Sequence, residues 1–223
     1  MTAKLFLRAV TKFISGVVSV GLLLFLSAGT LSFPNGWLFM GILFAPMLLA
    51  GVIMMIKNPA LLEKRLHAKE KRKEQNIVVI CSGLMFAAGF IVAGLGFRFG
   101  WYILPKGAAI GAAAVFLAAY LLYAEVLREN TYLSHAIEVQ ENQKVIDTGL
   151  YGIVRHPMYA AAILLSFSIP FVLGSLYAFP FFLIHPFLII LRIKNEEELL
   201  ERELEGYAAY KQKVKYRLIP FIW

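Results

Sequence analysis

The chain has 223 residues, of which 60% are hydrophobic and 16% are charged. A soluble domain is typically about half apolar and about a quarter charged, so this composition argues against a soluble protein and favours a membrane protein. The formal net charge is +8. The basic residues flank apolar runs, as membrane topology requires, so nucleic acid is not the expected partner. The single cysteine, Cys81, cannot form a disulfide within the chain or supply a cysteine metal site.

Four transmembrane spans are predicted in the first half of the chain. Each is an apolar run without charged residues, close to the roughly 20 residues that one crossing needs. The first resembles a signal peptide but is too long and lacks a clear cleavage site, so we expect an uncleaved helix. A basic loop, residues 57–76, joins the second span to the third. The four runs are residues 13–31, 37–56, 77–96 and 107–123.

A fifth apolar region, residues 158–191, is interrupted by proline and glycine. Its length fits two short helices that form a hairpin, with the turn near Gly174 and Ser175. The sequence therefore predicts an all-α polytopic membrane bundle of five or six spans. It divides into four transmembrane helices in residues 1–124 and a catalytic region in residues 125–223, which includes the hairpin.

The charged residues indicate the sidedness of this bundle. With a returning hairpin, 20 of the 22 Lys and Arg residues and all 14 acidic residues fall on one face. The positive-inside rule then predicts that both termini and both long polar segments are cytoplasmic. Polar groups at a membrane boundary should be paired, because an unpaired charge there costs about 2.5–3.5 kcal/mol. Arg and Glu at opposite ends of the hairpin are the expected partners.

The polar segments that flank the hairpin carry a motif. Gly149-Leu150-Tyr151 is followed by Arg155-His156-Pro157-Met158-Tyr159, and beyond the hairpin come Arg192, Glu196-Glu197, Gly206-Tyr207-Ala208-Ala209-Tyr210 and Pro220. In this order the elements resemble the isoprenylcysteine carboxyl methyltransferase family and, more distantly, the phospholipid N-methyltransferases. The resemblance implies S-adenosylmethionine as cofactor and a lipid or prenylated substrate in the bilayer.

The resemblance also implies the residues of the site. Arg192 and Glu197 are the expected catalytic residues, and no spacing of His and Glu indicates a metal site. The expected cofactor-binding residues are Gln140, Gln143, Lys144, Val145, Ile146, Tyr151, Arg155, His156, Pro157, Met158, Tyr159, Glu196 and Glu197.

The methyl acceptor decides what the site must do. A carboxylate is already ionised and needs only a cation to orient it, which Arg192 can supply as a bidentate fork. An ethanolamine headgroup arrives as an ammonium and needs a base, for which Glu196 or Glu197 would serve. The sequence thus favours an isoprenylcysteine-type carboxylate, with a phospholipid headgroup as the alternative. A non-catalytic transporter or scaffold is disfavoured, because the first four spans lack charges for an ion pathway. The oligomeric state stays open.

Overall fold

The computed structural model describes residues 3–67, 73–101, 104–132 and 139–223, and within these ranges every regular element is helical. The predicted all-α membrane fold is therefore confirmed. In chain order the elements are α1 Ala3–Ala28, α2 Pro34–Lys57, α3 Pro59–His67, α4 Lys73–Arg98, α5 Lys106–Glu129, η1 Gly149–Gly152, α6 Pro157–Val172, η2 Leu176–Ala178, α7 Phe179–Phe182, α8 Ile184–Glu203 and α9 Tyr207–Lys213.

Among the described residues, five helical stretches are long and apolar enough to cross a membrane. Three of them contain the second, third and fourth predicted apolar runs, and the first helix covers the first predicted run only as far as Ala28, three residues short of its predicted end. The fifth runs from η2 to the end of α8. The stretches are Ala3–Ala28, Pro34–Lys57, Gln75–Arg98, Lys106–Glu129 and Leu176–Glu203.

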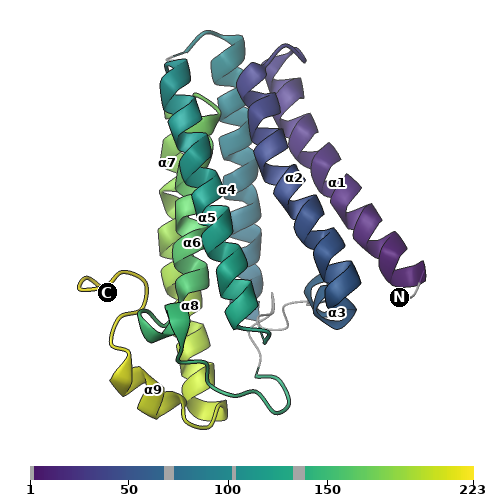
Figure 1. The fold of residues 1–223 in the computed structure, drawn as a ribbon. Coiled ribbons are helices and arrows are strands. Elements are labelled where there is room, and N and C mark those ends of the chain that lie inside the picture. The colour runs from purple at the N-terminus through teal and green to yellow at the C-terminus, as the bar shows by residue number, and fades with distance from the viewer. Residues whose placement is uncertain (1–2, 68–72, 102–103, 133–138) are drawn as a thin grey trace.

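The predicted hairpin is present. Helix α6 is an apolar helix of 16 residues, which spans about 24 Å at 1.5 Å per residue. The chain reverses at Gly174, whose φ is +72°, a conformation that glycine adopts without steric cost. The carbonyl oxygen of Gly174 accepts a hydrogen bond from the Leu104 N–H at 3.0 Å. This bond ties the turn to the connection between α4 and α5, at the far end of the bundle (Figure 1).

The interior of the bundle is filled by aromatic rings from several helices. Phe39 of α2 contacts Phe90 of α4 and Phe116 of α5, with ring centroids 5.5 and 5.9 Å apart. Phe182 of α7 lies 6.4 Å from Phe90. All four rings are buried. Because lipid is as apolar as these side chains, close packing rather than burial from water holds such helices together.

The polar parts of the chain gather at one end of the bundle. Figure 1 shows η1, α9 and the C-terminal segment around the end of α8 that projects beyond the other long helices. The two ends of the chain lie toward this end of the bundle, as a returning hairpin requires. The entrance and exit of the hairpin therefore meet at the end that carries the polar motif.

Candidate active site

A short 3-10 helix, η1, positions Tyr151. It begins at Gly149, whose φ is +52°. A Cβ atom there would lie 1.6 Å from a carboxylate oxygen of Glu129. That carboxylate approaches so closely because it accepts the Leu150 N–H at 3.0 Å. Only glycine satisfies both the backbone angle and this contact, which gives the first residue of the motif a structural reason.

The Arg155-His156-Pro157 stretch begins α6. Pro157 occupies the first turn of this helix, where its fixed φ fits and its missing N–H costs nothing. The N–H groups of Arg155 and His156 instead reach the C-terminal segment. They donate to the carbonyl oxygens of Tyr216 and Arg217, each at 2.9 Å. The motif is thus joined by backbone bonds to a segment about 60 residues further along the chain.

A buried ion cluster sits behind this stretch. One oxygen of Glu197, Oε1, accepts from Arg155 Nε at 2.7 Å and lies 3.2 Å from His156 Nε2. The other, Oε2, accepts from Arg217 Nε at 2.8 Å. Arg155 also donates to the carbonyl oxygens of Val214 and Lys215, at 2.7 and 2.8 Å. These contacts satisfy the buried charges and fasten α6, α8 and the C-terminal segment together.

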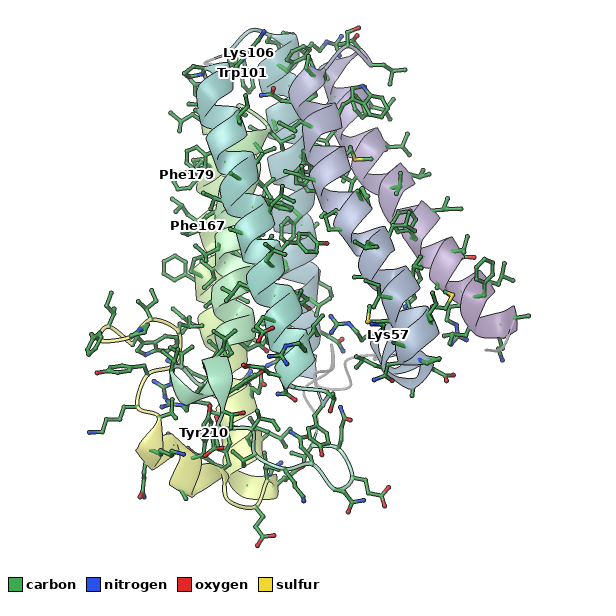
Figure 2. The ribbon with its side chains drawn as sticks, in the orientation of Figure 1. Lys57, Trp101, Lys106, Phe167, Phe179 and Tyr210 are labelled. Atoms are coloured by element: carbon green, nitrogen blue, oxygen red, sulfur yellow. The ribbon has the colours of Figure 1, made fainter. Side chains whose placement is uncertain are left out.

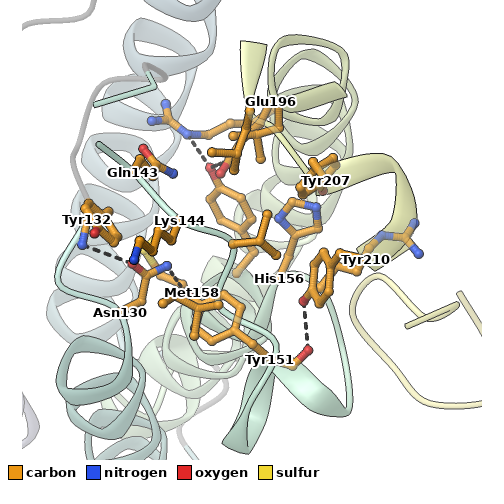
Figure 3. Close-up of a pocket in the computed structure, with 17 residues that line it drawn as sticks. Asn130, Tyr132, Gln143, Lys144, Tyr151, His156, Met158, Glu196, Tyr207 and Tyr210 are labelled. Atoms are coloured by element: carbon orange, nitrogen blue, oxygen red, sulfur yellow. Dashed lines mark hydrogen bonds between the residues drawn. The ribbon is translucent and has the colours of Figure 1, made fainter. Parts of the chain in front are cut away.

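A cavity opens beside the cluster, between α5, η1, α6, α8 and α9 (Figure 3). The space between its atoms, with the open mouth included, is about 830 Å³. Its walls are formed by Asn130, Tyr132, Gln143, Lys144, Val145, Ile146, Tyr151, Arg155, His156, Met158, Tyr159, Arg192, Glu196, Leu200, Leu204, Tyr207 and Tyr210.

Three polar side chains form a connected group on one wall of the cavity. Arg192 Nε donates to the hydroxyl oxygen of Tyr159 at 2.9 Å. The same hydroxyl donates to Glu196 Oε2 at 2.5 Å. Arg192 and Glu196 are four residues apart on α8, so they project from the same side of the helix. The cavity therefore presents a cation and a carboxylate side by side, bridged by one hydroxyl.

Three tyrosines line another part of the wall. Asn130 donates to the Tyr151 hydroxyl at 3.1 Å, and the Tyr210 hydroxyl donates to the Tyr151 carbonyl oxygen at 2.7 Å. The buried hydroxyl of Tyr207 has no hydrogen-bond partner among the residues described. Burial raises the pKa of all three phenols, so they are neutral donors. An orphaned buried hydroxyl at a cavity wall is a natural contact for a bound ligand.

The structure brings most of the predicted site residues together at this cavity. The ones that line it are Gln143, Lys144, Val145, Ile146, Tyr151, Arg155, His156, Met158, Tyr159, Arg192 and Glu196. Gln140, Pro157 and Glu197 are not among the lining residues. The side-chain amide of Gln140 donates to the carbonyl oxygen of Tyr132, which itself lines the cavity. Within the part of the chain that is described, no cluster of potential metal ligands is present.

Several lining residues had no predicted role, namely Asn130, Tyr132, Leu200, Leu204, Tyr207 and Tyr210. For the two C-terminal tyrosines a signal existed, because they belong to the Gly206-Tyr207-Ala208-Ala209-Tyr210 element. Gly206 has a φ of +83° at the start of α9. That left-handed turn directs the helix back toward the cavity. Asn130 and Tyr132 follow α5 without a comparable signal in the sequence.

Comparison with known proteins gives a family match and a structural similarity. Residues 109–202 match the model of the isoprenylcysteine carboxyl methyltransferase (ICMT) family. The fold is similar to the structure of the eukaryotic intramembrane Ras methyltransferase ICMT, with a TM-score of 0.54 and 20% sequence identity over 91% of this chain and 74% of that chain. No curated protein matches the sequence. The family match runs from α5 to α8, which supply both the hairpin and the polar group on the cavity wall.

Proposed function

We propose, from the match of residues 109–202 to the model of the isoprenylcysteine carboxyl methyltransferase family, that the chain methylates the carboxylate of an isoprenylcysteine-type acceptor with S-adenosylmethionine. The observation that carries the proposal is the group formed by Arg192, Tyr159 and Glu196 at the cavity wall. It lies where a membrane hairpin returns to the polar end of the bundle, within reach of both a water-soluble cofactor and a lipid-borne substrate.

The residues of the cavity fit the cofactor that the family implies. When bound, S-adenosylmethionine supplies a methyl group on a cationic sulfonium. The walls offer Lys144 for the carboxylate of the cofactor, Glu196 for its ammonium group, and the orphaned hydroxyl of Tyr207 for a further polar group. The faces of Tyr151 and Tyr210 can pack on an adenine or a sulfonium, with cation–π contacts contributing about 0.5–2 kcal/mol.

For a carboxylate acceptor, the wall residues need only position the reacting oxygen. A terminal carboxyl group has a pKa of about 3.3–3.7 and is ionised at neutral pH, so no proton has to be removed. Arg192 orients the carboxylate. The Tyr159 hydroxyl, which is hydrogen-bonded to both Arg192 and Glu196, fixes the positions of these two side chains. Fixing both reactants in line accounts for most of the catalysis that a displacement of this kind requires.

Glu197 takes a different part in this proposal from the one expected from sequence. Its three hydrogen-bond donors are Arg155, His156 and Arg217, and its side chain is only 4% exposed. We therefore assign Glu197 a positioning role and Glu196 the contact with bound ligands. A carboxylate held in three such interactions is a poor base, because they stabilise its ionised form.

One observation favours a second candidate, the methylation of an ethanolamine headgroup. Glu196 lies at the cavity wall and could accept a proton from an ammonium. The distribution of Lys and Arg supports a cytosolic cavity in either case, because 20 of the 22 basic residues belong to the sequence segments that are predicted to share its face.

Calorimetry on the protein in lipid nanodiscs tests the site. We expect S-adenosylhomocysteine, the product form of the cofactor, to bind, and Glu196→Gln to weaken that binding about tenfold, since a charge-assisted hydrogen bond is worth about 1.5–3 kcal/mol. Glu198→Gln is the matched control, because Glu198 is an exposed carboxylate on the same helix. Failure of the unchanged protein to bind would contradict the proposed function. Equal affinity in both variants would contradict the assignment of Glu196.

A further inference from the structure

The chain exposes large apolar side chains at its C-terminal end, outside the membrane-spanning helices. Ile219 is 51% exposed, Phe221 88% and Ile222 75%. Exposed apolar residues on the long helices face lipid and need no further explanation. A group of them on a polar segment does, because adjacent exposed apolar side chains mark an interaction surface. We call residues 217–223 the C-terminal loop.

The C-terminal loop is closed by its own hydrogen bonds. The carbonyl oxygen of Trp223 accepts the N–H groups of Arg217 and Leu218 at 2.8 and 2.9 Å. The Ile219 carbonyl oxygen accepts the N–H groups of Ile222 and Trp223, at 3.1 and 3.2 Å. The Arg217 guanidinium lies over the Trp223 ring, 5.0 Å from its centroid. The loop is therefore a hydrogen-bonded turn, and these bonds hold its tip, residues 219–222, in a defined orientation.

The tip has an unusual backbone. Phe221 has a φ of +67°, a left-handed conformation that is a rare outlier for a bulky residue. Its ring contacts the Tyr216 ring at 5.2 Å between centroids and still remains the most exposed of the large apolar side chains. Strain of this kind persists only where the surrounding structure imposes it, and it is common at functional surfaces.

The loop lies beside the polar ends of the membrane-spanning helices. Its root, Leu218, packs with Tyr159 of α6 and with Ile189 and Ile193 of α8. In Figure 2 the loop extends from the bundle at about the level of Lys57, the last residue of α2, on the side that carries Phe167 and Phe179. The tip therefore emerges beside the lipid-facing surface, at the end of the bundle that carries the cavity.

We propose that Ile219, Phe221 and Ile222 insert into the interface between lipid headgroups and acyl chains on the face that carries the cavity. Apolar and aromatic side chains with an adjacent basic residue favour this zone, and the exposed Lys215 is such a residue. The position of the tip beside the lipid-facing surface of the bundle favours lipid over a second protein as its occupant.

The inserted tip is coupled to the site by its stem. The carbonyl oxygens of Tyr216 and Arg217 accept the N–H groups of Arg155 and His156, and Arg217 is bonded to Glu197. Insertion would therefore fix one wall of the cavity at the depth of the lipid boundary. The proposal holds whatever the methyl acceptor is, because it rests on the loop and the bilayer alone.

Fluorescence in lipid nanodiscs tests the insertion. In a Cys81→Ser background, an environment-sensitive NBD label is placed at Phe221→Cys or, as the matched control, at Ala208→Cys, an exposed position on α9. We expect the label at position 221 to be blue-shifted and quenched about twofold or more by brominated lipids, and the label at 208 to be unaffected. Equal behaviour of the two labels would overturn the proposal. A blue shift at 221 without lipid quenching would also overturn it, by indicating contact with protein.

A second pair of variants separates insertion by the loop from partitioning of the label. With the label at Ile219→Cys, Phe221→Leu should keep the lipid quenching, whereas Phe221→Asp should remove most of it because a charge resists the acyl boundary. Retained quenching in Phe221→Asp would show that the label alone enters the lipid and would overturn the proposal.

Discussion

Arg155 and Glu197 lie 42 residues apart in the sequence, and a 2.7 Å bond between Nε and Oε1 joins them across the entrance and exit of the membrane hairpin. Both side chains are 4% exposed. Removing one partner of a buried pair leaves the other charge uncompensated, which costs far more than the pair itself contributes. The stability of the polar end therefore depends on this pair.

The first prediction concerns that pair. Glu197→Gln is expected to lower the free energy of unfolding by roughly 3–5 kcal/mol, because Arg155 and Arg217 lose a charged partner. Thermal unfolding in nanodiscs, followed by near-UV circular dichroism, measures the change. Asp147→Asn is the control, since it makes the same chemical change in the exposed pair with Lys213 and should leave the Tm unaltered. Equal effects of the two substitutions would argue against the structural role of Glu197.

The second prediction compares two glycines of the motif. Gly149→Ala should destabilise the protein by roughly 2–4 kcal/mol, because the new Cβ meets the Glu129 carboxylate as well as an unfavourable φ. Gly206→Ala should cost only about 1 kcal/mol, because its Cβ would meet just Val145 at 3.9 Å and the strain is in φ alone. Denaturant unfolding of both variants gives the ranking, and the reverse order would contradict the geometry of η1.

The third prediction separates two neighbouring tyrosines. Tyr207→Phe should weaken binding of S-adenosylhomocysteine about fivefold or more with little effect on stability, because its hydroxyl has no partner among the described residues until a ligand arrives. Tyr210→Phe loses the bond to the Tyr151 carbonyl oxygen and should cost about 1 kcal/mol of stability. Calorimetry measures the ligand affinity of both variants, and thermal unfolding measures their stability. A Tyr207→Phe variant with unchanged affinity would remove that hydroxyl from the ligand site.

The fourth prediction concerns the methyl acceptor. Arg192→Gln should reduce kcat/KM for a prenylcysteine carboxylate by about 100-fold, since the loss of a charged hydrogen-bond donor in a bidentate contact costs about 3 kcal/mol. Its effect on cofactor affinity should be much smaller. Lys194→Gln removes an exposed cation two residues away on α8 and should change neither quantity. A loss of cofactor binding equal to the loss of kcat/KM would place Arg192 at the cofactor instead.

Much of the fold could be predicted from sequence because it depends on composition over long runs. Charge-free stretches of about 20 residues identify α1, α2, α4 and α5 without knowledge of their neighbours. The hairpin turn was predictable from Gly174, since a glycine inside an apolar run is a local signal. The resemblance to the family likewise identified most of the lining residues.

The choice between Glu196 and Glu197 could not be predicted in the same way. Adjacent residues on a helix point about 100° apart, so the rotation of α8 about its axis decides which one meets the cavity. That rotation follows from the packing of α8 against α4 and α6. The sequence pattern of α8 alone does not reveal this packing. The role of Tyr207 depends similarly on the left-handed turn at Gly206, which sets the direction of α9.

The most direct test of the central claim is the chemical class of the methylated product. The protein in nanodiscs is incubated with methyl-labelled S-adenosylmethionine and either N-acetyl-farnesylcysteine or phosphatidylethanolamine, and the product is then treated with alkali. A methyl ester releases the label as volatile methanol, whereas an N-methyl group retains it. We predict volatile label with the farnesylcysteine acceptor, lost in Arg192→Gln and kept in Lys194→Gln. Label that is transferred only to phosphatidylethanolamine and survives alkali would contradict carboxyl methylation.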